Sequence, residues 1–219
     1  MTVARLQLLG AFEVRIDDDV AVLPRPVERM LAFLALRRQP QTRCAVAAAV
    51  WHGTPTARAL ARLDALCGEL PSPVRERISV RGDGRLALDE RWSVDLDDAL
   101  DAARRLHEDP EPRRSDDVLL RLELLPSWFD PWLHDVQDRY HRLRLAVLQR
   151  IGRHLLDAGD CDGAVDIALE LVAEDELRED AHHLLVAGLA SRGDLGQARR
   201  SFDRFRARLG SSLTRYFGK

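Results

Sequence analysis

The first part of the chain alternates apolar and polar residues in the way that is typical of short, half-buried strands. The alternating apolar positions lie on both sides of Gly10, at Leu6, Leu8, Phe12, Val14 and Ile16. The acidic stretch Asp17–Asp19 predicts a turn, and "VAVL" after it predicts a third strand. We therefore expect residues 4–23 to form a small sheet.

Three helical patterns follow these strands. In "VERMLAFLALRRQ", directly after two prolines, apolar residues recur at helical spacing. A short helix is expected over Arg43–Trp51 with Thr42 as its N-cap, because a threonine oxygen can accept an amide of the first turn. A third helix is expected over residues 54–71, with Thr54 as its cap and a row of leucines on one face.

A hairpin is predicted after the third helix. The sequence "RERISVRGDGRLALD" alternates apolar residues on both sides of Gly82–Gly84. Strands, three helices and a hairpin in this order predict an α+β winged helix with an extra N-terminal sheet over residues 1–92. In such a domain the third helix would lie in the major groove and the hairpin would flank the DNA backbone.

The remainder, residues 93–219, is predicted to be an all-α, tetratricopeptide-like domain. "DLDDALDAARRLHED" begins with acidic residues, which favour a helix N-terminus. A polar loop, "EDPEPRRSDD", and an aromatic turn, "LLPSWFDPW", precede a long helix from about Pro131 to Ala158. Two helix pairs then repeat with an offset of 34 residues, the tetratricopeptide period. The matching pairs are Leu155 with Leu189, Gly159-Asp160 with Gly193-Asp194, Ala164 with Ala198, and Ala168 with Phe202.

Charge is distributed unevenly along the chain. Through Trp92 there are 14 arginines against 11 acidic residues, a net charge of +3, whereas the remainder carries a net charge of −6. This division indicates different partners for the two regions and permits nucleic-acid binding by the first. No apolar run reaches the length of a membrane span, and the N-terminus lacks the pattern of a signal peptide. Three widely spaced cysteines fit reduced thiols, so we expect a cytoplasmic protein without membrane contact.

Arginines on the third helix and the hairpin are the candidate DNA-binding residues. Arg58 and Arg62 lie four residues apart and can read bases or phosphates, or can pair with Asp64 or Glu69 as ordinary surface charges. The candidates for phosphate contacts are Arg43 at the start of the second helix and, around the hairpin, Arg75, Arg77, Arg81 and Arg85.

No other residue pattern predicts chemistry. His134, His141 and the pair His182-His183 lack zinc-site spacing, so we expect solvated or packing histidines and no metal or cofactor. Cys44 and Cys67 are interpreted as small packing residues rather than as a redox switch. The aromatic residues of the turn, Trp128, Phe129 and Trp132, are expected in the core at the domain junction. Phosphate-binding and nucleophile motifs of enzymes are absent from the sequence, so we expect no enzyme.

The chain resembles the Streptomyces antibiotic regulatory protein (SARP) family, in which an OmpR-like winged helix precedes a bacterial transcriptional activator domain. The resemblance runs from about Arg5 to Gly210 and is carried by "LQLLGAFEVRID", "LAFLAL", "ARALARL", "VDLDDAL", "LLPSWFDPW", "RLRLAVLQRIGRHLLDAGD" and "LREDAHHLLVAGLASRGDLGQARRSFDRFRARLG". It implies sequence-specific binding to promoter DNA, often as a homodimer on repeats, recruitment of RNA polymerase, and regulation of actinobacterial secondary metabolism.

The third helix departs from this family. Relatives usually carry more arginine, and often an asparagine, through Arg62–Glu69, and often a large aromatic where this chain has Gly68. Its four charged residues sum to zero, whereas a helix that enters a groove lined by phosphates normally carries positive charge. The alternative is therefore a helical-repeat interaction or scaffold protein whose winged helix no longer binds DNA.

Overall fold

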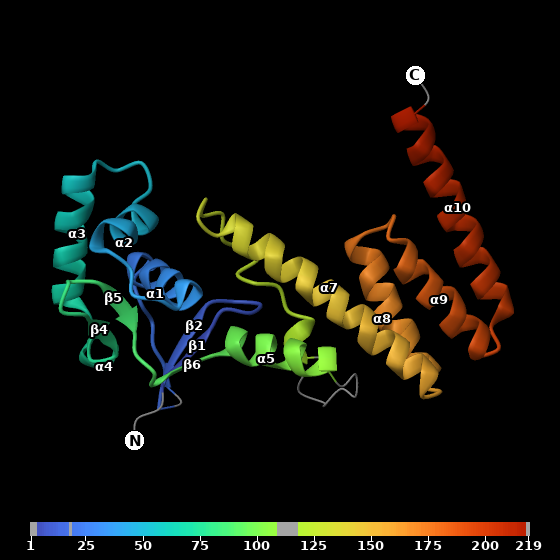
Figure 1. Cartoon of the computed structure of the whole chain (residues 1–219), viewed down its shortest axis with the longest axis horizontal. Coiled ribbons are helices and arrows are strands. Elements are labelled where there is room, and N and C mark those ends of the chain that lie inside the picture. The colour runs from blue at the N-terminus through green and yellow to red at the C-terminus, as the bar shows by residue number, and fades with distance from the viewer. Residues whose placement is uncertain (1–3, 18, 109–117, 218–219) are drawn as a thin grey trace. The chain divides into compact units, whose positions relative to one another are not determined.

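The structure is a computed structural model that describes residues 4–17, 19–108 and 118–217, with side chains described as far as residue 210 (Figure 1). The predicted loop "EDPEPRRSDD" lies outside the described residues except for Glu108. The chain forms two compact units, one of residues 1–100 with 122–140, the other of residues 101–121 with 141–219. The segment 122–140 therefore packs with the first unit. From the sequence it was assigned, with the rest of residues 93–219, to the second domain.

A four-stranded sheet opens the first unit. Its strands are β1 (Ala4–Gln7), β2 (Glu13–Ile16), β3 (Asp19–Val20) and β6 (Trp92–Val94), in the order β3-β2-β1-β6. β1 pairs antiparallel with β2 and parallel with β6. β6 was not predicted, because three residues are too few to show a period, although its two ends are buried in the alternating manner of a strand.

Three helices and a hairpin follow in the predicted order. The helices are α1 (Arg25–Arg37), α2 (Arg43–Val50) and α3 (Thr56–Glu69), with one further turn, α4 (Ser72–Arg75), that was not predicted. The hairpin pairs β4 (Ile78–Val80) with β5 (Leu86–Leu88). These elements confirm the winged helix, and Figure 1 shows α1, α2 and α3 grouped at one end of the unit.

The two predicted caps have different outcomes. The Thr42 hydroxyl accepts the Ala45 amide at 3.2 Å, which confirms it as the N-cap of α2. The Thr54 cap is wrong, because α3 begins at Thr56 and the residue before it is Pro55, which provides no side-chain cap. Proline fixes the extended backbone at that point, so the helix starts after it.

Segment 122–140 and the start of α5 (Asp95–Glu108) complete the first unit. The Asp95 carboxylate accepts the Leu8 and Leu9 amides at 2.8 and 3.0 Å, although burial raises the pKa of this carboxyl. Farther along, Trp128 packs on Phe12 with ring centroids 5.3 Å apart, and Arg25 lies over its ring.

The predicted aromatic core is confirmed only in part. Trp128 is buried, and Trp132 packs edge-on against Phe33 and donates its indole N–H to the Ala49 carbonyl at 3.1 Å. Phe129 was wrongly assigned to the core, since it is 80% exposed. Its position in an irregular turn gives it no periodic pattern from which its orientation can be read.

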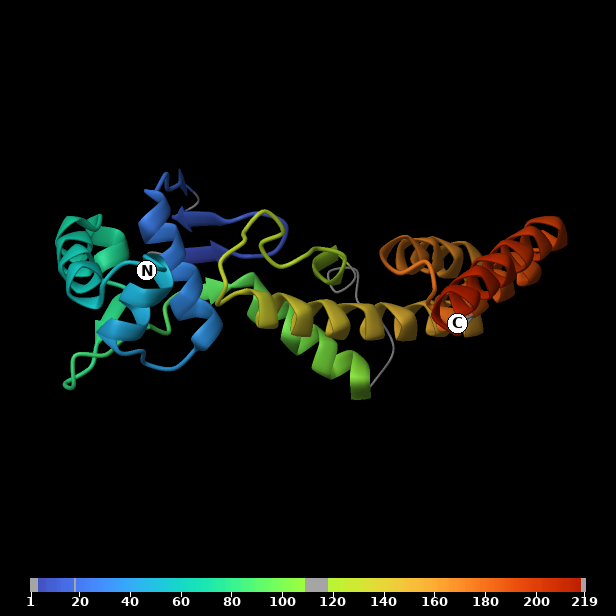
Figure 2. The same ribbon diagram turned by 90° about the horizontal axis from the view of Figure 1, so that it is seen from above.

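The second unit contains the repeated helices. They are the latter part of α7 (His134–Asp157), then α8 (Cys161–Glu174), α9 (Glu179–Ser191) and α10 (Leu195–Phe217), and Figure 2 shows the last three in succession. α9 packs against both α8 and α10. A core of small and branched residues, including buried Ala164 and Ala198, lies between the helices.

The turns before α8 and α10 are equivalent in detail, which confirms the repeat at 34 residues. Gly159 and Gly193 have φ of +85° and +90°, a conformation that glycine adopts without strain. The following residues, Asp160 and Asp194, each cap the next helix by accepting an amide at 3.0 Å. The last matched pair differs, because Ala168 is buried whereas Phe202 is 42% exposed.

Two glycines provide a test of this packing. A Cβ at Gly188 of α9 would lie 2.8 Å from Val165 Cγ2 of α8, whereas a Cβ at Gly68 of α3 would meet nothing within 4 Å. We expect Gly188→Ala to lower the free energy of unfolding by about 1 kcal/mol, since overpacking outweighs the gain in helix propensity. Gly68→Ala should instead raise it by about 0.5–1 kcal/mol, because only propensity changes. Urea unfolding of both variants measures this, and equal effects would contradict close packing of α8 on α9.

Candidate nucleic-acid interface

α3 has one buried and one exposed face. Ala59 and Leu63 are buried and fix the helix on the unit, because they lie four residues apart on one side. Arg58 and Arg62 are exposed, and no ion pair or hydrogen bond engages either guanidinium within the part of the chain that the structure describes. Both side chains can therefore reach an external partner such as a base edge or a phosphate.

Asp64 of α3 pairs with Arg43 of α2, and not with either of these arginines. The contact joins the first residue of α2 to the middle of α3. It also neutralises Arg43, whose side chain is 34% exposed. The pair is exposed and engages one of the guanidinium nitrogens, so Asp64 competes with a phosphate for Arg43 without excluding it.

Cys67 lies next to this ion pair on α3. Burial raises the pKa of its thiol, and Arg43 acts in the opposite direction by favouring the thiolate. Cys44 on α2 is exposed, so its interpretation as a packing residue is wrong, and both cysteines are free thiols.

The arginines around the hairpin fall into two groups. Arg75 donates to the carbonyls of Gly68 and Leu70, where it satisfies acceptors at the end of α3. Arg77 is only 4% exposed and donates to the Pro73 carbonyl at 2.6 Å. Both side chains hold the segment between α3 and β4 in place. Arg77 is turned away from solvent, whereas Arg75 is exposed although its guanidinium is engaged.

The other two arginines flank the tip of the hairpin. Arg81 and Arg85 are exposed, and the Arg81 amide donates to the Arg85 carbonyl at 2.9 Å to close the loop. Arg85 pairs with Asp83 at 3.0 Å, an exposed contact that contributes little to stability. Arg81 has no such partner among the described residues. Together with Arg58 and Arg62, it gives the winged helix three unengaged cations.

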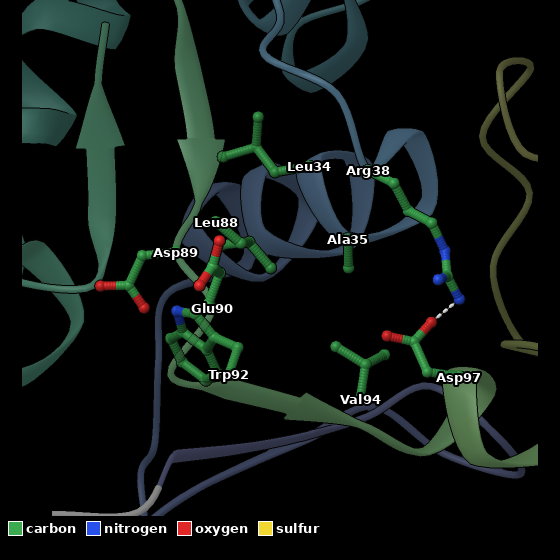
Figure 3. A pocket seen from close by; sticks show the side chains of 9 residues that line it. All are labelled: Leu34, Ala35, Arg38, Leu88, Asp89, Glu90, Trp92, Val94 and Asp97. Carbon is green, nitrogen blue, oxygen red and sulfur yellow. Dashed lines mark ion pairs between the residues drawn. The ribbon is translucent and has the colours of Figure 1, made fainter.

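The first unit also contains a cavity of about 310 Å³ between α1, β5 and β6 (Figure 3). On one side Arg38 pairs with Asp97, and on the other Asp89 accepts the Arg91 amide at 2.9 Å. The indole N–H of Trp92 donates to a backbone carbonyl. Most polar groups of the lining are therefore bound within the protein, and we assign no ligand to this cavity.

The adjacent histidines His182 and His183 have packing or surface partners. His182 is buried, stacks on Phe205 with centroids 4.2 Å apart, and its Nε2 lies 3.0 Å from the Glu176 carbonyl. His183 lies 3.8 Å from Glu179 on the same helix. Among the described residues no group of three side chains is arranged to hold a metal ion. Within the same ranges no helix is long and apolar enough to cross a membrane.

Comparisons with known proteins agree with this architecture. The family model described as bacterial transcriptional activator domain matches residues 78–216. Among solved structures, the fold is similar to that of EmbR from Mycobacterium tuberculosis, solved in complex with a low-affinity phosphopeptide, with a TM-score of 0.72 and 15% identity. That match covers 100% of this chain and 62% of the EmbR chain. No curated protein matches the sequence.

Proposed function

The chain belongs to the bacterial transcriptional activator domain family of transcription regulators, and we propose that it binds promoter DNA through its winged helix. The expected SARP-type architecture, a winged helix joined to this domain, is confirmed by the family match and by the EmbR-like fold. The observation that carries the proposal is the exposed pair Arg58 and Arg62 on α3, free of intramolecular partners among the described residues. Arg81 at the hairpin tip adds a cation that can contact the phosphate backbone of the DNA.

The roles of these residues follow from their chemistry. Arginine donates two parallel hydrogen bonds to guanine and also pairs with phosphate, so Arg58 and Arg62 are assigned to base or phosphate contacts in the major groove. Arg81 and Arg85 are assigned to the flanking backbone. We propose further that the helical unit contacts RNA polymerase or another protein, because stacked helical repeats present extended binding surfaces. Homodimer formation, a cytoplasmic location and control of actinobacterial secondary metabolism remain proposals from the family resemblance.

One observation favours the alternative function of a scaffold that does not bind DNA. The ion pair between Arg43 and Asp64 cancels the charge of a cation at the start of α2, beside α3. If that cancellation abolishes DNA affinity, the acidic helical region is the remaining functional surface. A variant that changes the charge of α3 distinguishes the two proposed functions.

Asp64→Arg tests the proposal. Because the change removes a negative charge, frees Arg43 and adds an arginine, we expect tighter binding to duplexes from the chain's own gene neighbourhood. The dependence of log K on log salt should steepen by about 1–2, in proportion to the added phosphate contacts. Gel-shift titration of wild type and variant at two salt concentrations measures both quantities.

Asp138→Arg is the matched control, since it makes the same charge change at an exposed site on another helix, α7. It should leave the affinity near that of wild type. Binding no tighter than micromolar at low salt for every neighbouring promoter, in wild type and in Asp64→Arg alike, would support the scaffold instead.

A further inference from the structure

The last helix of the second unit is strongly basic, although the region that contains it is acidic overall. Over residues 195–210, α10 carries one acidic residue, Asp203, against five arginines. All five are exposed, namely Arg199, Arg200, Arg204, Arg206 and Arg208. The outer helix of a repeat array needs a polar surface for solubility, but a surface of mixed charge meets that need. Asp203 pairs with Arg199 at 3.9 Å, so four arginines remain in excess on this surface and call for another explanation.

Three of these arginines form a stripe. Arg200, Arg204 and Arg208 are spaced by four residues and so lie along one side of the helix, about 6 Å apart along its axis. Buried Ser201 and Phe205 hold the adjacent side of the helix, about 100° around its axis from Arg200 and Arg204, against the unit. Like charges at this spacing repel one another, so the stripe weakens the isolated helix by a few tenths of a kcal/mol per pair. Folding alone therefore does not account for it.

The guanidinium groups of the stripe are only loosely engaged. Arg208 pairs with Glu176 at 2.9 Å, and Arg204 lies 3.3 Å from the Ser201 hydroxyl. Arg200 has no ion pair or hydrogen bond among the described residues. The pair between Arg208 and Glu176 is exposed and contributes little to stability, so an external anion can replace it at small cost.

We propose that the stripe Arg200, Arg204 and Arg208 of α10 binds the phosphate backbone of duplex DNA. The choice of DNA as the anion rests on the proposed function. A duplex presents closely and regularly spaced charges, which suits a row of arginines better than a single acidic side chain does. The charges of α3 cancel, so a second cationic element would add electrostatic affinity that α3 by itself does not supply. Contacts to the phosphate backbone do not distinguish one DNA base sequence from another.

The test is Arg200→Ala/Arg204→Ala in the full chain, with Arg139→Ala/Arg142→Ala on α7 as the control. Each variant loses two exposed positive charges. Affinity should be measured for a promoter duplex and for an unrelated duplex of equal length. Removing two phosphate contacts should weaken both duplexes by the same factor and lower the salt slope by about 2. The loss should be about tenfold larger at 50 mM than at 200 mM salt, while the control stays near wild type.

The outcomes separate this inference from the proposed function. Wild-type affinity for both duplexes in the α10 variant would overturn the inference alone. Loss of binding to purified RNA polymerase with unchanged duplex affinity would also overturn it, and would identify α10 as a protein-binding surface. The wild-type chain could bind the promoter duplex and the unrelated duplex equally, and bind both more weakly in the α10 variant. That result would support DNA binding by the stripe and contradict promoter recognition. A chain that binds neither duplex would contradict both. Circular dichroism of each variant verifies that the fold is intact.

Discussion

Arg58→Ala and Arg62→Ala are each expected to weaken binding to a promoter duplex by about 1–3 kcal/mol, if the side chain contacts a base edge. The expectation follows from their position, since both are exposed on α3 and each lies about 100° around the helix axis from its buried neighbour, Ala59 or Leu63. Neither is engaged by a partner among the described residues, so truncation removes the contact without leaving a buried group unpaired. Fluorescence anisotropy with the promoter duplex and a scrambled duplex measures the loss and its sequence dependence.

The pattern of losses identifies the kind of contact. A base contact reduces the preference for the promoter over the scrambled duplex, whereas a phosphate contact weakens both equally and lowers the salt slope by about 1. Arg5→Ala is a suitable control, because Arg5 is exposed on β1 of the same unit and has no described partner. Thermal unfolding should be unchanged in all three variants. Unaltered binding in both α3 variants would place recognition outside this helix.

Much of the fold is readable from the sequence because its signals are local. The helix pairs recur at 34 residues, and the glycine and aspartate of each turn have a direct structural role in it. Thr42 caps α2 because the residues it needs are its immediate neighbours. By contrast β6 depends on pairing with β1 across most of the first unit, and three residues carry too little periodicity to predict that.

The candidate site was only partly readable, because charge partners are set by the tertiary structure. Sequence spacing suggested partners for Asp64 within α3, yet its partner is Arg43 on the preceding helix. Arg77 falls in a polar stretch that indicates exposure, but it is 4% exposed and bound to a carbonyl. The four-residue spacing of Arg200, Arg204 and Arg208 was visible in the sequence, although only the structure shows that this side of α10 is exposed.

A buried arginine in the second unit gives the largest expected effect on stability. Arg144 of α7 is 1% exposed and donates to Glu174 of α8 at 2.6 Å and to the Arg121 carbonyl at 3.1 Å. Glu170 lies 3.9 Å away and also pairs with Arg121. This network joins α7 to α8 within the repeat that the sequence predicted. Water has little access to Arg144 itself, whereas the side chains of Glu170 and Glu174 are each 23% exposed, so the buried guanidinium depends on these partners.

Arg144→Met is expected to lower the free energy of unfolding by about 3 kcal/mol, because it leaves acceptors of the network without their donor. Arg144→Met/Glu174→Met should recover at least about 1 kcal/mol of that loss, since an apolar pair has no charge to desolvate. Urea unfolding followed by circular dichroism measures both. A single variant within about 0.5 kcal/mol of wild type would show that solvent reaches the network. A double variant less stable than the single one would show that Glu174 has a further role in holding α7 to α8.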